Sequence, residues 1–270
     1  MIYIHVGYGK TGTSSIQCYL ANNRDKLKSY GFAYPCHPSD YNALRYKVNS
    51  GNGTILLNKS FVYDKNYHYI FSSENLFFAF LEVKHFENVV KMYGGGVHFI
   101  IYTRNLVPHF LSSYNQTIKR NGSTETILQF AKRYGVIYDY IYNLIKLCMT
   151  YKIAHTVMNY SNHCEYLNKS FIDIILPLKK ESFYTNSIKI IKPINRSLSK
   201  NELTLQRILN VIVHKKYSSK FSDFMVNNFK NKNIVKLNLN KTQSLYLKEK
   251  CRPKINKVNY NINENEHIVI

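Results

Sequence analysis

The sequence begins MIYIHVGYGKTGTSS (Met1–Ser15), and this stretch decides the fold. Ile2–Val6 is a short apolar run of the kind that forms a buried strand. Gly7-Tyr8-Gly9 ends the run, and from Thr13 onward apolar residues recur at helical spacing. These residues are Ile16, Tyr19, Leu20 and Leu27. The stretch therefore predicts a strand, a glycine-rich turn and a helix, with Gly31 as a C-terminal stop.

The same alternation continues along the chain. Three more apolar strands are predicted, at His68–Ser72, Val97–Thr103 and Ile153–Met158. Helical patterning over Leu76–Met92 follows the first of these strands and ends at Gly94-Gly95-Gly96. The chain therefore returns to a strand after each predicted helix.

Helical spacing also marks the segments on either side of Asn121-Gly122, a pair that predicts a helix end. Pro108 fits the first turn of the earlier helix. The predicted buried face of that helix is Phe110, Leu111, Tyr114 and Ile118. The predicted buried face of the later helix is Ile137, Ile141, Leu144, Ile145 and Cys148.

Strands that alternate with helices through residues 1–160 predict βαβ units. We therefore expect an α/β fold, with a central, mainly parallel sheet that carries helices on both faces. Residues 161–270 are expected to be mostly helical. At 270 residues, the chain is predicted to be one domain with an α/β core and a helical C-terminal part.

In the predicted C-terminal part, one segment shows a helix start and another segment has two interpretations. Ser199 and Glu202 have the spacing of a capping box. The apolar residues that follow at helical spacing are Leu203, Leu205, Ile208, Leu209 and Ile212. The Asn- and Lys-rich end, residues 227–270, has two interpretations: a partly loose tail, or a segment that docks through Leu245, Leu247 and Val258.

Composition excludes several classes of protein. With 45% hydrophobic residues the chain can bury a core, so wholesale disorder is excluded. No apolar run approaches the roughly 20 residues of a membrane span, and the N-terminus becomes polar too early for a signal peptide. The five cysteines are scattered without a C-x-x-C pair, which favours a reducing compartment over disulfides or zinc. We expect a cytoplasmic protein without a metal.

The charge is strongly positive, with 37 basic and 16 acidic residues and a net charge of +21. Such a protein attracts anions, whether nucleic acid, anionic lipid, or phosphorylated and sulfated small molecules. The abundance of Lys, Asn, Ile and Tyr with no Trp is also what a compositionally biased genome produces in any protein. Charge alone therefore identifies no partner.

The turn at Gly7–Ser15 has the chemistry of an anion site. Its glycines allow a tight turn that exposes backbone N–H groups, and the helix start adds unpaired donors and a partial positive charge. Lys10 and the hydroxyls of Thr11, Thr13, Ser14 and Ser15 add more donors. A Walker A loop requires a glycine five residues before Gly9, where this chain has Ile4. The alternative is a glycine-rich turn with incidental hydroxyls.

A second anion site is predicted after the Val97–Thr103 strand. Arg104 leaves the carboxyl end of that strand, the edge at which open α/β sheets bind ligands. Ser112 follows eight residues later, inside a predicted helix. An arginine offers a planar bidentate fork to a phosphate, and a serine hydroxyl can complete the site. Two anion sites at one sheet edge predict a ligand with phosphates at both ends.

These motifs resemble those of the sulfotransferases, which transfer a sulfuryl group from 3′-phosphoadenosine 5′-phosphosulfate (PAPS). Lys10-Thr11-Gly12-Thr13-Ser14 is similar to the family's loop for the 5′-phosphosulfate, and Arg104 with Ser112 to its 3′-phosphate site. Three further segments resemble bacterial carbohydrate sulfotransferases, namely Tyr34-Pro35 followed by His37, Ser72-Ser73-Glu74-Asn75, and Asn195-Arg196-Ser197-Leu198-Ser199. The resemblance covers residues 1–120, is fainter to 215 and is absent beyond.

The resemblance implies a P-loop-like three-layer sandwich, PAPS as co-substrate, and a hydroxyl of a carbohydrate or other polar molecule as acceptor. It makes Lys10 the group that neutralises charge on the leaving oxygen and Glu74 the base. Residues Thr11, Gly12, Thr13, Ser14 and Ser15 would bind the 5′-phosphate, and Arg104 and Ser112 the 3′-phosphate. Glu74 could instead be an acid that stabilises a helix N-terminus. His5, His37 and His109 are rival bases.

The sequence is also compatible with other functions. A nucleotide-dependent kinase with an atypical loop is disfavoured by the failed Walker spacing. A binding module for nucleic acid or polyanions would fit the charge of +21, but no zinc-finger or RNA-recognition signature accompanies it, and no specific nucleic acid is expected. A relative that binds the cofactor without turnover is a further alternative. The acceptor and the oligomeric state are not encoded in any motif.

Overall fold

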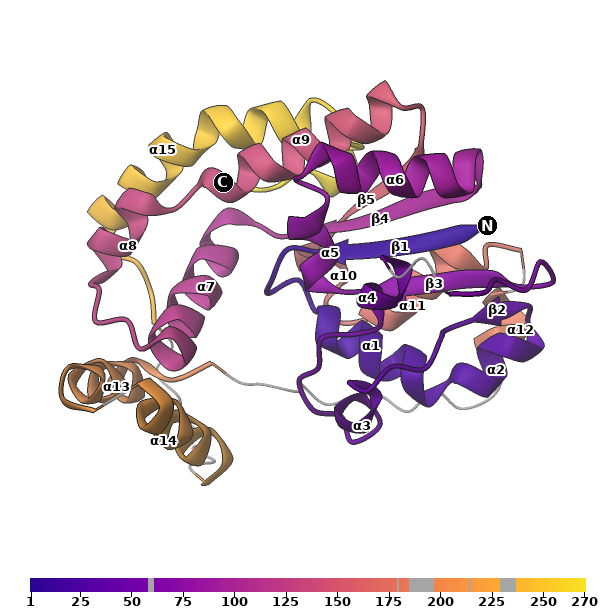
Figure 1. Ribbon diagram of the computed structural model, residues 1–270. Coiled ribbons are helices and arrows are strands. Elements are labelled where there is room, and N and C mark those ends of the chain that lie inside the picture. The colour runs from indigo at the N-terminus through magenta and orange to yellow at the C-terminus, as the bar shows by residue number, and fades with distance from the viewer. Residues whose placement is uncertain (58–60, 179, 185–196, 214, 229–236) are drawn as a thin grey trace. The chain divides into compact units, whose positions relative to one another are not determined.

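Five parallel strands form one sheet (Figure 1). In the computed structural model they are β1 (Ile2–Gly7), β2 (Phe32–Ala33), β3 (His68–Ser72), β4 (Val97–Thr103) and β5 (Ala154–Asn159). Their order is β2-β3-β1-β4-β5, and every neighbouring pair is parallel, which confirms the α/β class and the parallel sheet. The sequence does not predict β2, because a strand of two residues leaves no periodic pattern.

The structure describes residues 1–57, 61–178, 180–184, 197–213, 215–228 and 237–270. Contacts within the chain divide it into two compact units, which we describe one at a time. Unit 1 is Met1–Arg104, Tyr140–Ile194 and Asn261–His267. Unit 2 is Asn105–Asp139, Asn195–Tyr260 and Ile268–Ile270. The prediction of one domain stays a prediction, because compactness does not show whether either unit folds by itself.

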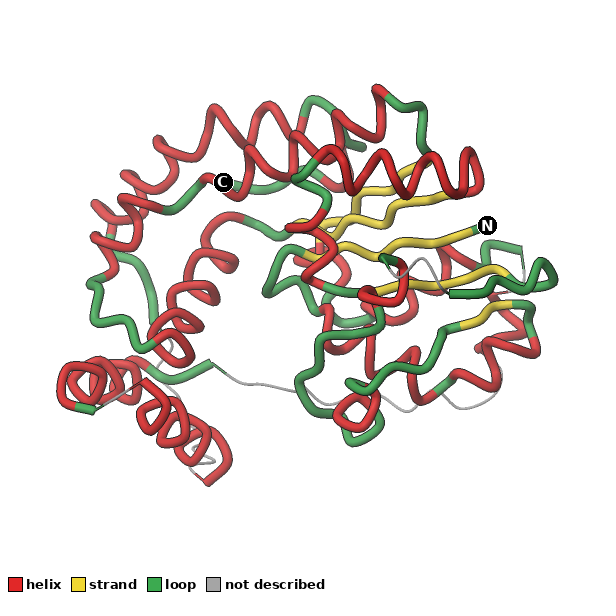
Figure 2. Tube along the Cα trace, in the orientation of Figure 1, coloured by secondary structure: helices red, strands yellow, loops and turns green. Residues whose placement is uncertain are grey.

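Helices cover both faces of the sheet in unit 1 (Figure 2). On one face, α1 (Thr13–Asn22), α2 (Arg24–Ser29) and α11 (Leu167–Ile175) share a buried apolar cluster with Ile100 of β4. On the other, Phe80 at the C-cap of α5 (Glu74–Ala79) and Phe86 of α6 (Val83–Tyr93) pack against Phe99, with ring centroids 5.2 and 5.3 Å apart. Phe99 and Ile100 are consecutive strand residues and so point to opposite faces. The sheet is therefore the middle of three layers.

Shorter helices complete unit 1. These are α3 (Asp40–Ala43), α4 (Gly53–Leu56), α10 (Tyr160–His163) and α12 (Lys180–Tyr184). A single 3-10 turn, Gly94–Gly96, precedes β4, and another, Glu264–Glu266, lies in the C-terminal segment of the unit. The helix α9 (Val136–Thr150) begins in unit 2 and ends in unit 1. Four residues of its predicted buried face, Ile141, Leu144, Ile145 and Cys148, are buried, whereas Ile137 is half-buried.

Two predicted helices are each divided in the structure. The helix expected from Thr13 through Leu27 breaks at Asn23, whose backbone leaves the helical region with φ of −115° and ψ of 20°, and whose side-chain amide donates to the Tyr19 carbonyl. The helix expected over Leu76–Met92 breaks because Glu82 has an extended backbone and starts α6 anew. Apolar spacing alone does not detect such breaks, since it continues on both sides of them.

Among the described residues of unit 2, the regular secondary structure is helical, and loops connect the helices. Its helices are α7 (Leu106–Asn121), α8 (Ile127–Arg133), α13 (Lys200–Ile212), α14 (Lys215–Asn228) and α15 (Lys241–Asn259). Phe110, Tyr114 and Ile118 of α7 are buried as predicted, whereas Leu111 is half-buried. Gly122 ends α7 in the left-handed region, with φ of 67°. The capping box of Ser199 and Glu202 is present at the start of α13.

Two expectations about which residues of the C-terminal part are buried are partly wrong. The segment 241–259 docks as α15, with Leu247, Cys251, Ile255 and Val258 buried, but Leu245 is 55% exposed and is not an anchor. On α13 only Leu203 of the predicted face is buried. Leu205, Ile208 and Ile212 are exposed and Leu209 is half-buried. Within the described ranges, none of the helices is both long enough and apolar enough to cross a bilayer.

Candidate functional site

The carboxyl ends of three neighbouring strands meet at one edge of the sheet. β1 lies between β3 and β4, and the parallel register sets Ile4 level with Phe71 and Phe99. The chain leaves β1 toward the β2 side of the sheet and leaves β4 toward the β5 side. Open parallel sheets bind ligands where such a reversal occurs. The segments that follow these strands contain Lys10, Glu74 and Arg104, so this edge brings together three of the predicted site residues.

The loop between β1 and α1 is closely packed, and this packing requires a glycine at two positions. Lys10 and Gly12 both have a left-handed backbone, with φ of 70° and 81°. A Cβ added at Gly7 would lie 2.2 Å from the Thr13 hydroxyl oxygen. A Cβ added at Gly12 would lie 2.3 Å from Leu167 Cδ2 and 2.7 Å from Tyr160 Cε2. Because the loop folds back tightly over the end of β1, neither position has room for a side chain.

The loop has donors available for an anion. The N–H groups of Ser15 and Ile16 donate to the Gly12 carbonyl, so the earlier N–H groups of α1, those of Thr13 and Ser14, have no partner within the helix. The hydroxyls of Thr11 and Thr13 are buried and have no hydrogen-bond partner. Ser15 uses its backbone N–H inside the helix, and the role of its hydroxyl stays a prediction. The helix start therefore has the donors that a phosphate or sulfate accepts.

Arg104 holds the loop to the end of β4. Its Nη1 donates to the Lys10 carbonyl at 2.8 Å, and its backbone N–H donates to the Tyr8 hydroxyl at 3.0 Å. The guanidinium carbon lies 5.0 Å from the centroid of the Tyr160 ring, a cation–π arrangement. The Nε of Arg104 is buried without a hydrogen-bond partner. The side chain is thus anchored at one nitrogen and retains donor capacity for a further acceptor.

Glu74 lies beside the loop. It is the first residue of α5, where the Ser73 hydroxyl accepts a hydrogen bond from the Asn75 backbone N–H at 3.1 Å. Its Oε2 would lie 3.8 Å from a Cβ built at Gly9. Burial raises the pKa of the Glu74 carboxyl, and the nearby positive charge of Lys10 offsets part of that rise. A carboxyl with a raised pKa next to a cation suits a proton acceptor that works near neutral pH.

Tyr8 and Tyr160 are site residues that the sequence does not predict. Tyr8 is buried inside the loop, and burial raises the pKa of its hydroxyl, which stays protonated while it accepts from Arg104. Tyr160 packs against Gly12 and beneath Arg104. A tyrosine among 24 gives no positional signal. The one indication that Tyr160 belongs to the site is its position two residues after Met158, where the predicted strand ends.

Residues of the C-terminal segment of unit 1 form hydrogen bonds to α10, the short helix that contains Tyr160. The Glu266 carboxylate accepts from the Asn159 backbone N–H at 2.5 Å and contacts His163 Nε2 at 2.8 Å. The Asn159 side-chain amide donates to the His267 carbonyl at 2.8 Å. Because Asn159 is the N-cap of α10 and His163 is its last residue, these bonds fix both ends of the helix that contains Tyr160.

The other predicted residues have different surroundings. His5 is buried between the rings of Tyr102 and Phe171, and burial lowers its pKa to about 3, so it is neutral near pH 7. Its Nδ1 is 2.8 Å from the Ser72 hydroxyl, which indicates a structural role. His37 Nε2 is 2.8 Å from the Thr54 hydroxyl.

Ser112 and His109 belong to unit 2. Ser112 is half-buried on α7, and His109 is buried, with its Nδ1 against the Tyr134 hydroxyl. The pairing of Ser112 with Arg104 stays a prediction. Asn195 and Arg196 lie outside the described residues, whereas Ser199 is the cap of α13.

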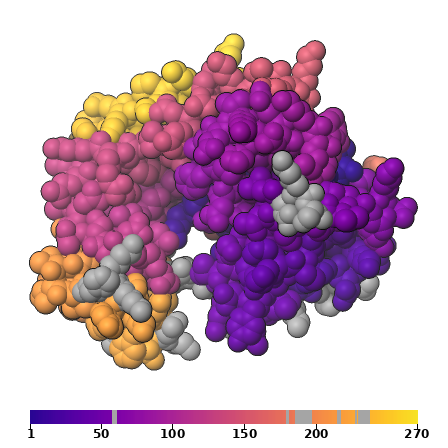
Figure 3. All heavy atoms as spheres, in the orientation of Figure 1, coloured from indigo at the N-terminus to yellow at the C-terminus, as the bar shows by residue number. Residues whose placement is uncertain are grey.

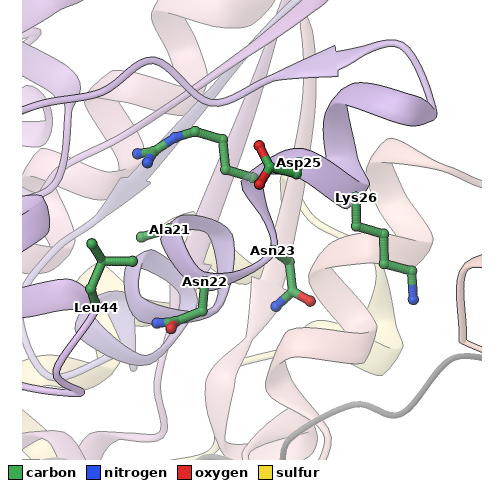
Figure 4. Close-up of a pocket in the computed structure, with 7 residues that line it drawn as sticks. Ala21, Asn22, Asn23, Asp25, Lys26 and Leu44 are labelled. Carbon is green, nitrogen blue, oxygen red and sulfur yellow. The ribbon is translucent and has the colours of Figure 1, made fainter.

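A depression of about 470 Å³ lies at the junction of α1 and α2 (Figure 4). Arg24 in its lining donates to Asp40 at 2.5 Å and to the Tyr34 carbonyl at 2.7 Å. The amides of Asn22 and Asn23 donate to helix carbonyls. These polar groups secure the helix junction, and the predicted site residues do not line the depression.

Comparisons with protein-family models, with curated proteins and with solved structures find no match to this chain. Among the residues that the structure describes, there is no cluster of three or more His, Cys, Asp or Glu side chains that could hold a metal ion.

Replacing Gly12 by alanine should damage both the loop and the fold. The left-handed backbone and the contacts with Leu167 and Tyr160 together should cost about 2 kcal/mol or more of unfolding free energy. Gly95→Ala is the matched control, because its Cβ would meet nothing within 4 Å. Chemical denaturation of both variants checks this, and equal stabilities would contradict the described loop.

Glu74→Gln should change how stability depends on pH. A carboxyl whose pKa is raised on folding binds more protons in the folded state, so it lowers the unfolding free energy as pH rises above about 4.5. The glutamine variant lacks this loss and should be more stable than wild type near pH 7, with the gap closing toward pH 4. Denaturant midpoints across that range measure it. A wild type that gains stability relative to the variant with rising pH would refute the raised pKa.

Proposed function

We propose that this protein is a PAPS-dependent sulfotransferase that transfers a sulfuryl group to a hydroxyl of a carbohydrate or similar polar acceptor. The observation that carries the proposal is the meeting of a glycine-rich loop, Lys10, Arg104 and a carboxyl of raised pKa at the ends of three adjacent strands. The order β2-β3-β1-β4-β5 puts this edge at the reversal point of the sheet, in keeping with a P-loop-like site.

In this proposal the loop binds the 5′-phosphosulfate. The first-turn N–H groups of α1 and the hydroxyls of Thr11 and Thr13 would donate to the phosphate and sulfate oxygens. Arg104 would bind the 3′-phosphate through the nitrogens that the Lys10 carbonyl does not occupy. Tyr160 would keep the guanidinium in place by supporting one of its faces.

The reaction proposed is an in-line displacement at sulfur. The acceptor oxygen forms a bond to sulfur while the bond from sulfur to the bridging oxygen breaks, and adenosine 3′,5′-bisphosphate leaves with that electron pair. Glu74 takes the proton of the acceptor hydroxyl, and the Lys10 ammonium offsets the charge that develops on the bridging oxygen. Catalysis of this kind depends on positioning and electrostatics, as in phosphoryl transfer.

Lys10→Ala should lower the turnover number strongly, by roughly 100-fold or more, because the charge on the leaving oxygen loses its neighbour. Lys84→Ala, at an exposed lysine of α6, is the control and should retain full activity. Transfer of labelled sulfate to a panel of saccharide hydroxyls measures turnover. Unchanged transfer by the Lys10 variant would exclude this role, and absence of transfer by wild type to any acceptor, together with metal-dependent ATP turnover, would favour a kinase.

Arg104→Ala separates two roles, that of holding the loop and that of recognising the 3′-phosphate. If Arg104 binds the 3′-phosphate, the variant loses its preference for PAPS over adenosine 5′-phosphosulfate, which lacks that group. If Arg104 only supports the Lys10 carbonyl, both donors weaken by the same factor. We expect the preference to fall by about tenfold or more, since bonds to charged groups contribute about 1.5–3 kcal/mol. Michaelis constants for both donors decide it, and Arg252→Ala is the control at an exposed arginine.

A further inference from the structure

The hairpin of α13 and α14 in unit 2 has a polar interior. Gln206 is fully buried, and its Nε2 donates to the Ser218 carbonyl at 2.9 Å and to Asn210 Oδ1 at 3.1 Å. Ser222 is also fully buried and donates to the Lys119 carbonyl at 3.3 Å. Both helices pack against α7 on this side. The side of the hairpin that faces its own unit is therefore fastened by hydrogen bonds as well as by apolar contacts.

Leu203 of α13 and Met225 of α14 are buried on this side, whereas several other large apolar side chains of the two helices are exposed. At about 100° per residue, Ile208 is about 200° around the helix from Gln206, and Phe224 is about 200° from Ser222. The exposed fractions are 45% for Leu205, 54% for Ile208, 73% for Val211, 76% for Ile212, 63% for Tyr217 and 54% for Phe224. We call these six residues the hairpin face. A single exposed leucine needs no explanation, but six large apolar residues on one pair of helices indicate a binding surface.

The hairpin is also basic. Residues 199–228 contain Lys200, Arg207, Lys215, Lys216 and Lys220 but only two acids, Glu202 and Asp223. Both acids are engaged, because Glu202 completes the capping box and Asp223 pairs with Arg120 at 2.7 Å. Lys200 and Lys220 are exposed. The hairpin therefore combines apolar and aromatic side chains with positive charge that nearby carboxylates do not cancel. Figure 3 shows the atoms of α13 and α14 in orange.

We propose that the hairpin face docks on the surface of an anionic lipid bilayer. Amphipathic helices that lie in a membrane interface have this combination of aliphatic and aromatic side chains with lysines, which meet the acyl boundary and the headgroups respectively. A second copy of the chain would bring together two surfaces of the same positive sign on molecules that each carry +21. Nucleic acid would attract the lysines but leave the aliphatic side chains without a partner. Charge complementarity and apolar exposure together favour lipid.

Sedimentation of the intact protein with lipid vesicles tests the proposal. Wild type should bind phosphatidylcholine vesicles that contain about 30% phosphatidylserine and should bind pure phosphatidylcholine far more weakly. Val211→Ser combined with Ile212→Ser should weaken binding about tenfold, and Lys220→Glu should weaken it several-fold. The matched controls are Val62→Ser with Leu178→Ser, at residues 86% and 97% exposed in unit 1, and Lys84→Glu on α6.

Each of the other outcomes would overturn the proposal. Controls that weaken binding as much as the hairpin variants would indicate attraction by total charge alone. A large loss of thermal stability in the Val211/Ile212 variant, absent from the control pair, would show that these side chains are covered within the protein. A concentration-dependent dimer that this variant abolishes, without any vesicle binding by wild type, would assign the face to a second copy. Sulfuryl transfer plays no part in the assay, so its result is independent of the proposed activity.

Discussion

The hydrogen bond from Arg104 Nη1 to the Lys10 carbonyl ties the two halves of the site together. It joins the end of β4 to the loop after β1, across the point where the chain reverses direction in the sheet. The backbone of Lys10 is left-handed, a conformation that costs a lysine about 1 kcal/mol or more unless its surroundings impose it. Arg104, which packs over the Tyr160 ring, is one of the groups that impose this left-handed conformation on Lys10.

This bond changes the arrangement that the sequence suggests. From the sequence, Lys10 and Arg104 are predicted to bind the two phosphate ends of one nucleotide. In the structure the guanidinium contacts the backbone of Lys10, so the two residues form one electropositive corner. Glu74 is a carboxyl beside this corner, and its raised pKa reflects a site in which burial outweighs the attraction of the nearby ammonium. A corner that concentrates positive charge and supplies one proton acceptor suits transfer of an anionic group.

The parts of the fold with long periodic patterns were predictable from the sequence. The strands near residues 2, 68, 97 and 153 follow from apolar runs, and the loop follows from its glycines and hydroxyls. The breaks at Asn23 and Glu82 were not predictable, because they depend on a local hydrogen bond and a single backbone angle.

Ile208 and Ile212 show a second limit of prediction from the sequence. Helical spacing identifies an apolar face, but only packing decides whether that face is covered, and here the buried face carries Gln206 instead. Within the site, the Arg104–Lys10 contact required coordinates, because it joins a side chain to a backbone atom 94 residues away.

Titration calorimetry with adenosine 3′,5′-bisphosphate tests the central claim most directly. The claim is that the corner formed by the β1 loop and Arg104 binds a nucleotide with phosphates at both ends. The account predicts stoichiometric binding to wild type, and weaker binding of adenosine 5′-monophosphate, which lacks the 3′-phosphate. A well-folded protein that binds neither nucleotide, or that binds both equally, would contradict it.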